Sequence, residues 1–485
     1  MNRQIRLLGI AGLILFILLF AWLTNIQVVS AKRLNDNPLN TRQAVKDFSQ
    51  PRGAIQTADG VVVADSVDTN DQFQRLRQYP TGPLFAHITG YFSFTFGSEG
   101  VERTYNKELT GNANTLKLNS IGDLLLDKKR TANVTLTLTQ KLQQVATQAL
   151  GPRKGAVVAL DPRTGAVLAM ADYPSFDPNP LSAHDQQTVH AAWNQLVADT
   201  NKPLLPRAYR ERYFPGSTFK IVTASTGLAD GSVTTTQPVY PSLTELPLPQ
   251  SGGQVLKNFG GERCGGPLPQ IIAVSCNTAF AQMGLDLGAQ KMSAGALAFG
   301  FNSVPPLDLP AAAQSLFPPA SAFRFNAPAL AKSAIGQQDV QASPLQMALA
   351  GAAIANKGVA MGPHVMAEVR DSEGQVIETF KPQPWKTAIT PEVASTMTDM
   401  MVGVVQHGTA TGVALPNVQV AAKTGTAQTG NNTSHTWMVA FAPSQAPSIV
   451  VAVIVENQPN VSEATGGVVA APIAKAVLQA ALGSS

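Results

Sequence analysis

The chain has 485 residues, of which 44% are hydrophobic and only 14% are charged, and this length allows about two to three domains with a large core. Its 35 basic and 31 acidic residues leave a net charge of +4 without a basic block, so the sequence does not indicate nucleic-acid binding. It contains neither an H-E-x-x-H nor a C-x-x-C segment, so we expect no metal and no cofactor.

The first predicted element is a membrane anchor. Residues 7–31 carry no charge, and the apolar part of this run, 7–29, reaches the roughly 20 residues that span a bilayer. Arg3 and Arg6 precede the run and favour a cytoplasmic N-terminus. We therefore expect a cytoplasmic tail over 1–6, a single-pass anchor in the cytoplasmic membrane and an extracytoplasmic remainder.

A cleaved signal peptide is the alternative to this anchor. Val29-Ser-Ala31 can be read as a signal-peptidase site, and Lys32 and Arg33 weaken the charge bias across the span. The apolar run is longer than the roughly 7 to 15 residues of a signal peptide. This length favours an uncleaved anchor.

The segment after the anchor differs from it in composition, because it is polar and then alternates between apolar and polar residues. Residues 35–50 are polar, with clusters of Asn and Asp, and predict a stalk. Residues 51–64 alternate in the manner of a β-hairpin, with its turn at Asp59-Gly60.

Helices and short strands follow one another in the rest of the chain. Apolar residues form a helical stripe over 139–150, and a second helix is predicted from Gly216 to Leu228, ending near Gly231. A third, helix-like stretch covers 468–482. Three short β-rich runs broken by turns indicate an antiparallel sheet: 418–426, 437–442 and 449–455. We expect an α+β sandwich in which the second helix faces the strand that carries Lys423.

Ser217-Thr-Phe-Lys220 places a hydroxyl and an amine three positions apart on that second helix. Positions i and i+3 share one helix face, so the amine can reach the hydroxyl. A lysine can serve as the base that activates a serine if burial or a second cation lowers its pKa. Alone the pattern is weak, because any solvated helix can show it.

Two further segments strengthen this interpretation. Ser275-Cys-Asn277 by itself could be a helix cap, and Lys423-Thr-Gly-Thr426 could be a strand end with a solvated lysine. In this order along one chain, however, the three segments match the S-x-x-K, S-D-N and K-T-G signature of penicillin-binding proteins and class A β-lactamases. Cys276 departs from S-D-N only at the middle position.

The chain therefore resembles the penicillin-binding proteins over its C-terminal two-thirds. The strand pair that opens the transpeptidase domain of that family is similar to residues 155–170, with its turn over 161–165. Further landmarks follow in the expected order: Ala342–Gln346, Asn356–Gly358, His407–Ala410 and Trp437–Pro443.

The N-terminal part resembles the class B members of this family. Pro51–Ala64 is similar to their R-G-x-I-x-D-x-x-G segment, with departures at Thr57 and Ala58, and Gly100–Glu102 continues the resemblance. A glycosyltransferase domain, which class A members carry, does not fit into residues 30–133. The resemblance implies a pedestal or dimerisation-like domain over 30–133, as compact as in mycobacterial and related actinobacterial members, and a penicillin-binding/β-lactamase-like serine transpeptidase domain over 134–485.

This resemblance implies a role for each motif residue. Ser217 attacks a D-Ala-D-Ala stem peptide of peptidoglycan, Lys220 takes its proton, and Ser275 relays a proton to the leaving amine. Asn277 orients the lysines and binds the substrate backbone. The backbone N–H groups of Ser217 and Thr426 form an oxyanion hole. The substrate-binding segment consists of Lys423, Thr424, Gly425 and Thr426.

The implied partners are stem peptides, β-lactams, the membrane and wall-synthesis or cell-division proteins.

Three alternatives to the transpeptidase function stay open. A β-lactamase needs a positioned carboxylate for deacylation, and no E-x-x-L-N-like segment lies between the second and third motifs. A D,D-carboxypeptidase would transfer the acyl group to water. A non-enzymatic β-lactam sensor would retain the acyl group, but residues 1–6 leave no room for a cytoplasmic signalling domain.

Cys264 and Cys276 are the only cysteines and lie twelve positions apart. In an extracytoplasmic domain a disulfide can persist, and the turn-like segment 262–267 could bring the first cysteine back to the second motif. We hypothesise that they pair. The alternative is a free, buried Cys276 that behaves as a small apolar residue.

Overall fold

The structure is a computed structural model that describes residues 2–26, 45, 48–111, 131–430, 432–459 and 465–483. The chain divides into two compact units. One consists of Met1–Pro51 and Val67–Leu76, and the other of Arg52–Ser66 and Arg77–Ser485.

The first unit contains the long helix α1 (Asn2–Thr24). This helix is long and apolar enough to cross a membrane, and its described side chains are exposed. It begins before the apolar run because Asn, Arg and Gln also tolerate helical backbone. The end of the predicted anchor (27–29), the alternative cleavage site (29–31) and most of the predicted stalk (35–50) lie outside the described residues.

A sheet with the order β15-β14-β6-β1-β2-β3 forms the pedestal. The predicted hairpin is confirmed, because Ile55 of β1 pairs antiparallel with Ala64 of β2. Distant segments complete the sheet, since β6 pairs with both β1 and β14. The six strands are β1 (Ile55–Gln56), β2 (Val62–Asp68), β3 (Arg75–Gln78), β6 (Ala132–Leu136), β14 (Met366–Asp371) and β15 (Val376–Thr379).

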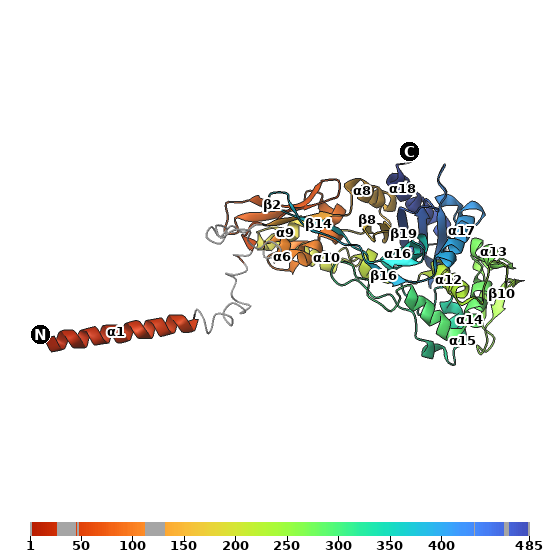
Figure 1. The fold of residues 1–485 in the computed structure, drawn as a ribbon, viewed down its shortest axis with the longest axis horizontal. Coiled ribbons are helices and arrows are strands. Elements are labelled where there is room, and N and C mark those ends of the chain that lie inside the picture. Colours follow the sequence, from red (N-terminus) through yellow and green to blue (C-terminus); the bar gives the residue numbers. More distant parts are fainter. Residues whose placement is uncertain are drawn as a thin grey trace. The chain divides into compact units, whose positions relative to one another are not determined.

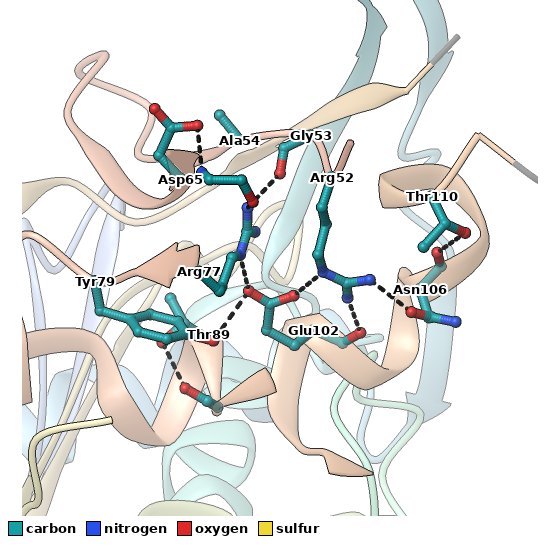
Figure 2. A network of polar contacts seen from close by, with 12 residues as sticks. Arg52, Gly53, Ala54, Asp65, Arg77, Tyr79, Thr89, Glu102, Asn106 and Thr110 are labelled. Atoms are coloured by element: carbon teal, nitrogen blue, oxygen red, sulfur yellow. Dashed lines mark hydrogen bonds and ion pairs between the residues drawn. The ribbon is translucent and has the colours of Figure 1, made fainter. Parts of the chain in front are cut away.

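A buried charge network holds the pedestal segments together (Figure 2). The Glu102 carboxylate accepts hydrogen bonds from Arg52 Nε at 2.5 Å and Arg77 Nε at 2.6 Å, and from the Tyr79 hydroxyl at 3.2 Å. Burial would raise the pKa of this carboxyl, but the two guanidiniums hold it below its ordinary value. Two segments that carry the family resemblance, at Arg52 and at Glu102, thus meet in space.

The part of the chain expected to form the transpeptidase domain is built on a five-stranded antiparallel sheet with the order β17-β18-β19-β7-β8. This arrangement confirms the strand pair predicted over 155–170 and the three β-rich runs near the C-terminus. The strands are β7 (Gly155–Leu160), β8 (Val167–Tyr173), β17 (Ala421–Gly430), β18 (Thr433–Ala442) and β19 (Ile449–Pro459).

Helices cover both faces of this sheet (Figure 1). Helix α8 (Gln140–Leu150) and helix α18 (Ala471–Leu482) pack against each other and against the sheet, while α16 (Pro344–Ala355) packs on β19 and β7. The predicted helix at the first motif is present as a 3-10 turn, η4 (Gly216–Phe219), followed by α12 (Lys220–Asp230). It ends at Gly231, whose φ of +77° closes a helix well.

The other elements surround this core. Along the chain between β3 and η4 they are η2 (Gly82–Phe85), α4 (Ala86–Thr89), β4 (Phe92–Ser93), β5 (Gly97–Ser98), α5 (Gly100–Thr104), α6 (Asn106–Leu109), α9 (Asn179–Ser182), α10 (Gln186–Ala198) and α11 (Arg207–Arg210). Later in the chain they are β9 (Tyr240–Leu243), β10 (Glu245–Pro247), β11 (Val255–Lys257), η5 (Phe259–Gly261), β12 (Cys264–Gly266), α13 (Leu268–Ala273), α14 (Asn277–Ala298), η6 (Ala320–Phe323), α15 (Ala327–Ser333), β13 (Val359–Met361), β16 (Pro384–Thr387), α17 (Pro391–His407), η7 (Thr411–Val413) and η8 (Gly466–Ala470).

Candidate active site

Ser217 lies in the 3-10 turn that precedes α12, half-buried at the surface of the sheet. The turn is fixed from both sides: Gly216 N donates to Gly336 O at 2.9 Å, and Trp437 Nε1 donates to Phe214 O at 3.0 Å. The serine is therefore held at one place against β18 and its neighbour β17.

Gly425 allows this close approach. A Cβ at this position would lie 2.9 Å from Thr218 Cγ2, 3.0 Å from Pro215 O and 3.0 Å from the Trp437 Cβ. A side chain of any size would push β17 away from the turn. The close packing of β17 against the turn before α12 therefore requires a glycine at this position of the third motif.

Lys220 is fully buried, and its amine points to the second motif. The amine donates to Asn277 Oδ1 and to Ser275 O, each at 2.7 Å, and more weakly to Ser275 Oγ at 3.3 Å. Within the described part of the chain, none of its hydrogen bonds goes to the Ser217 hydroxyl. The sequence placed the two groups on one helix face, but the oxygen atoms of the second motif attract the amine in this state.

Lys423 reaches the same serine from the opposite side. Its buried amine donates to Ser275 Oγ at 2.8 Å and to Thr424 O at 2.9 Å. Ser275 has a left-handed backbone with φ of +59°, which is uncommon for a residue with a side chain and occurs at functional sites. The three motifs thus meet at one hydroxyl.

The two lysines have perturbed pKa values. Burial, and then the nearby Lys423 ammonium, lower the pKa of Lys220 well below its ordinary value. Burial alone lowers the pKa of Lys423 to about 7. A neutral Lys220 beside a charged Lys423 is the protonation state that a base and a carboxylate-binding cation require.

Two cavities open on Ser217, and Phe259, Asn277 and Thr426 also line both. The larger has a volume of about 610 Å³ and the smaller about 260 Å³. The smaller one contains Ser275 and a set of hydroxyls, among which Thr409 Oγ1 and Thr424 Oγ1 lie 2.6 Å apart. The larger is further lined by Val255, Leu256, Lys257, Asn258, Gly260, Lys332, Ile335, Gln337, Gln428 and Asn432.

The structure contains a disulfide between Cys264 and Cys276, with a Cα–Cα distance of 5.8 Å. It joins β12 to the start of α14. Asn258 adds a second connection, because its Oδ1 accepts from Thr278 N at 2.9 Å while its Nδ2 donates to Glu262 O at 2.9 Å. The loop 258–264 is therefore connected to the region of the second motif twice, once by the disulfide and once by the hydrogen bond from Thr278.

Several lining residues were not singled out from the sequence. Thr409 lies within the landmark segment His407–Ala410, which could have pointed to it. Lys332, Gln337 and residues 255–260 have no local signal, because only the tertiary fold brings them to Ser217. Among the described residues, no group of three or more His, Cys, Asp or Glu could hold a metal ion.

Comparison with known proteins agrees with this geometry. Residues 155–479 match the family model of the penicillin binding protein transpeptidase domain. The chain belongs to the class B penicillin-binding proteins. Residues 52–134 of this penicillin-binding protein match the model of the penicillin binding protein A dimerisation domain.

Relatives cover this class B penicillin-binding protein over nearly its whole length. It is 41% identical to the peptidoglycan D,D-transpeptidase PbpA of Mycolicibacterium smegmatis and 39% identical to PbpA of Mycobacterium tuberculosis, with 99% of each chain covered. The solved structure of penicillin-binding protein A from M. tuberculosis, as a ceftriaxone acyl-enzyme complex, has a TM-score of 0.84 and 38% identity. That match covers 90% of this chain and 100% of the other.

Proposed function

We propose that this penicillin-binding protein is a peptidoglycan D,D-transpeptidase that works through a serine acyl-enzyme and is inhibited covalently by β-lactams. One observation supports this most directly. Two buried lysines meet at the Ser275 hydroxyl, beside a half-buried Ser217 that opens into two cavities. The acyl-enzyme complex of the relative supports the same chemistry.

In the acylation step, Ser217 Oγ forms a bond to the carbonyl carbon of the penultimate D-Ala. Lys220, neutral because its pKa is lowered, takes the hydroxyl proton. The bond between that carbonyl carbon and the terminal D-Ala nitrogen then breaks, and Ser275 passes a proton from Lys220 to the leaving nitrogen. The Ser275 hydroxyl, in contact with both amines, is suited to this relay.

The third motif holds the substrate. A charged Lys423 attracts the terminal carboxylate, and the hydroxyls of Thr424 and Thr426 line the smaller cavity where that carboxylate would lie. Backbone N–H groups of Ser217 and Thr426 would stabilise the oxyanion, a contribution of about 10² to 10³ in rate per donor. Asn277 would orient Lys220 and bind the peptide backbone.

Transfer of the acyl group to an amine of a second stem peptide completes a cross-link. Transfer to water would instead give the D,D-carboxypeptidase product from the same acyl-enzyme. We propose transpeptidation as the main outcome, in line with the names of the relatives, and a role in cell division with wall-synthesis partners docked on the pedestal.

We also propose a single-pass topology with residues 1–6 in the cytoplasm and 7–29 in the cytoplasmic membrane. The proposed pedestal covers 30–133 and the transpeptidase domain 134–485. The apolar helix α1 supports the anchor. Strand β6 spans the proposed pedestal boundary, and β14 and β15 join the pedestal sheet from within the transpeptidase segment.

The nucleophile can be tested on the full-length protein in detergent. Ser217→Ala should abolish covalent labelling by penicillin, detected as a mass increase of the intact protein, and leave the far-UV circular dichroism unchanged. Ser242→Ala, at an exposed serine on β9, is the matched control and should label as the wild type does. Labelling of the Ser217→Ala protein would show that another residue is the nucleophile.

A further inference from the structure

The groove around Ser217 changes charge from one cavity to the other. Among the described residues that line the larger cavity, the charged ones are Lys257 and Lys332. Among those that line the smaller cavity, the charged one is Glu262. Glu262 is exposed and forms no ion pair within the described part of the chain, so its charge is available to a ligand.

The proposed chemistry decides which molecule enters the smaller cavity, and this inference rests on the proposed function. Ser275, Thr424 and Thr426 line that cavity, so the leaving D-Ala occupies it during acylation. The acceptor nitrogen must form its bond at the carbonyl carbon from which the leaving nitrogen departed. It therefore approaches through the same cavity, past Glu262.

We propose that Glu262 is a specificity residue that attracts the cationic acceptor amine and thereby favours transfer to an amine over transfer to water. An alkyl amine resembles a lysine side chain, with a pKa near 10, and arrives as an ammonium ion. A carboxylate at the cavity mouth raises the local concentration of such a cation. The nitrogen then loses a proton to solvent before it attacks.

In the transfer step the neutral amine forms the new C–N bond and the ester C–O bond to Ser217 breaks. One N–H proton passes through Lys220 to the Ser217 oxygen. Glu262 takes no part in this bond exchange, so it is not a catalytic residue.

The surrounding structure holds Glu262 in position. Its backbone oxygen accepts from Asn258 Nδ2 at 2.9 Å, and Asn258 in turn accepts from the first turn of α14. The disulfide from Cys264 to Cys276 fixes the chain two residues further on. The backbone that carries Glu262 is therefore held in place beside the cavity, which lowers the cost of ordering the loop on binding.

The test measures how the acyl-enzyme partitions. Full-length protein in detergent is acylated with an N-acyl-D-alanyl thioester, and the products of aminolysis and hydrolysis are separated with Nα-acetyl-lysine amide, whose side-chain amine has a pKa near 10, as the acceptor. Glu262→Gln should lower the ratio of aminolysis to hydrolysis by roughly three- to fivefold, the upper range for one exposed ion pair. Glu262→Asp should restore part of it. Penicillin acylation should not decrease.

Matched controls separate this effect from a general loss of charge. Glu245→Gln removes the same charge from the neighbouring β10 and should leave the ratio unchanged. Hydroxylamine, mostly uncharged at neutral pH, should react equally well with wild type and Glu262→Gln.

An unchanged ratio in Glu262→Gln, or an equal fall in Glu245→Gln, would overturn this proposal while leaving the transpeptidase function intact. Absence of acylation of the wild type by both penicillin and thioester would instead overturn the proposed function.

Discussion

Lys220 and Lys423 have different tasks although both amines contact Ser275. Lys220 is surrounded by Asn277 Oδ1 and Ser275 O, and it must give up its charge to act as a base. Lys423 lies on β17 beside the hydroxyls of the smaller cavity, where a cation binds a carboxylate. The two lysines are not interchangeable, because Lys220 needs a neutral amine and Lys423 needs a charged one.

Arginine substitutions separate these two tasks. Lys220→Arg should abolish penicillin acylation at neutral pH, because a guanidinium stays protonated and cannot serve as base. Lys423→Arg preserves the positive charge and should retain measurable acylation. The second-order rate constant of acylation by a fluorescent penicillin measures both. Equal loss in the two variants would mean that the lysine roles are wrongly assigned.

The same residues predict a bell-shaped pH profile for that rate constant. As the pH falls, Lys220 takes up a proton and loses its function as base, so the rate decreases on the acidic side. As the pH rises past about 7, Lys423 loses the charge that attracts the carboxylate, so the rate decreases on the alkaline side. Lys423→Arg should remove the alkaline decrease, because arginine does not titrate in this range. An alkaline decrease that persists in this variant would assign it to another group.

At the scale of elements, the site depends on how closely β17 approaches the turn before α12. The β-runs and the helix could be predicted from sequence because their signals are local: periodicity, the glycine that ends α12, and three short motifs. The direction of the Lys220 amine could not, since it depends on oxygens 55 and 57 positions away in sequence. Nor could the position of Lys332, which reaches the site only through tertiary packing, whereas the two cysteines did point to the loop at 262–267.

Gly425 offers a test of this close approach. Gly425→Ala places a methyl group about 3 Å from Thr218, Pro215 O and Trp437, so β17 must shift. We expect a loss of about 1 to 3 kcal/mol in unfolding free energy and a slower acylation, measured by urea denaturation and by the acylation rate constant. Gly362→Ala is the control, because its Cβ would meet no atom closer than 3.4 Å. Equal stability of both variants would contradict the packing role of Gly425.

At the scale of the whole molecule, pedestal and transpeptidase segments share secondary structure. Strands β14 and β15, from residues 366–379, complete the sheet that begins with the hairpin of β1 and β2. Sequence patterns do not predict such an insertion, because pairing between distant strands leaves no local signal. The buried network around Glu102 lies beside this sheet and connects segments around residues 52, 77 and 102 (Figure 2).

Removing the charge of Glu102 should therefore destabilise the protein. Glu102→Gln keeps the shape of the side chain but leaves Arg52 and Arg77 buried without their counter-ion. We expect a loss of about 3 to 5 kcal/mol in the free energy of unfolding.

This contribution depends on pH. The pKa of Glu102 is lower in the folded protein than in the unfolded chain, so its stabilisation is present above the unfolded pKa and is lost as the pH falls through the folded pKa. Urea denaturation of the full-length protein measures the loss at neutral pH and its decrease in acid. Glu368→Gln, which removes the partner of the partly exposed Arg370 on β14, should cost no more than about 1 kcal/mol. A cost for Glu102→Gln as small as that of this surface control would show that the network does not hold the pedestal together.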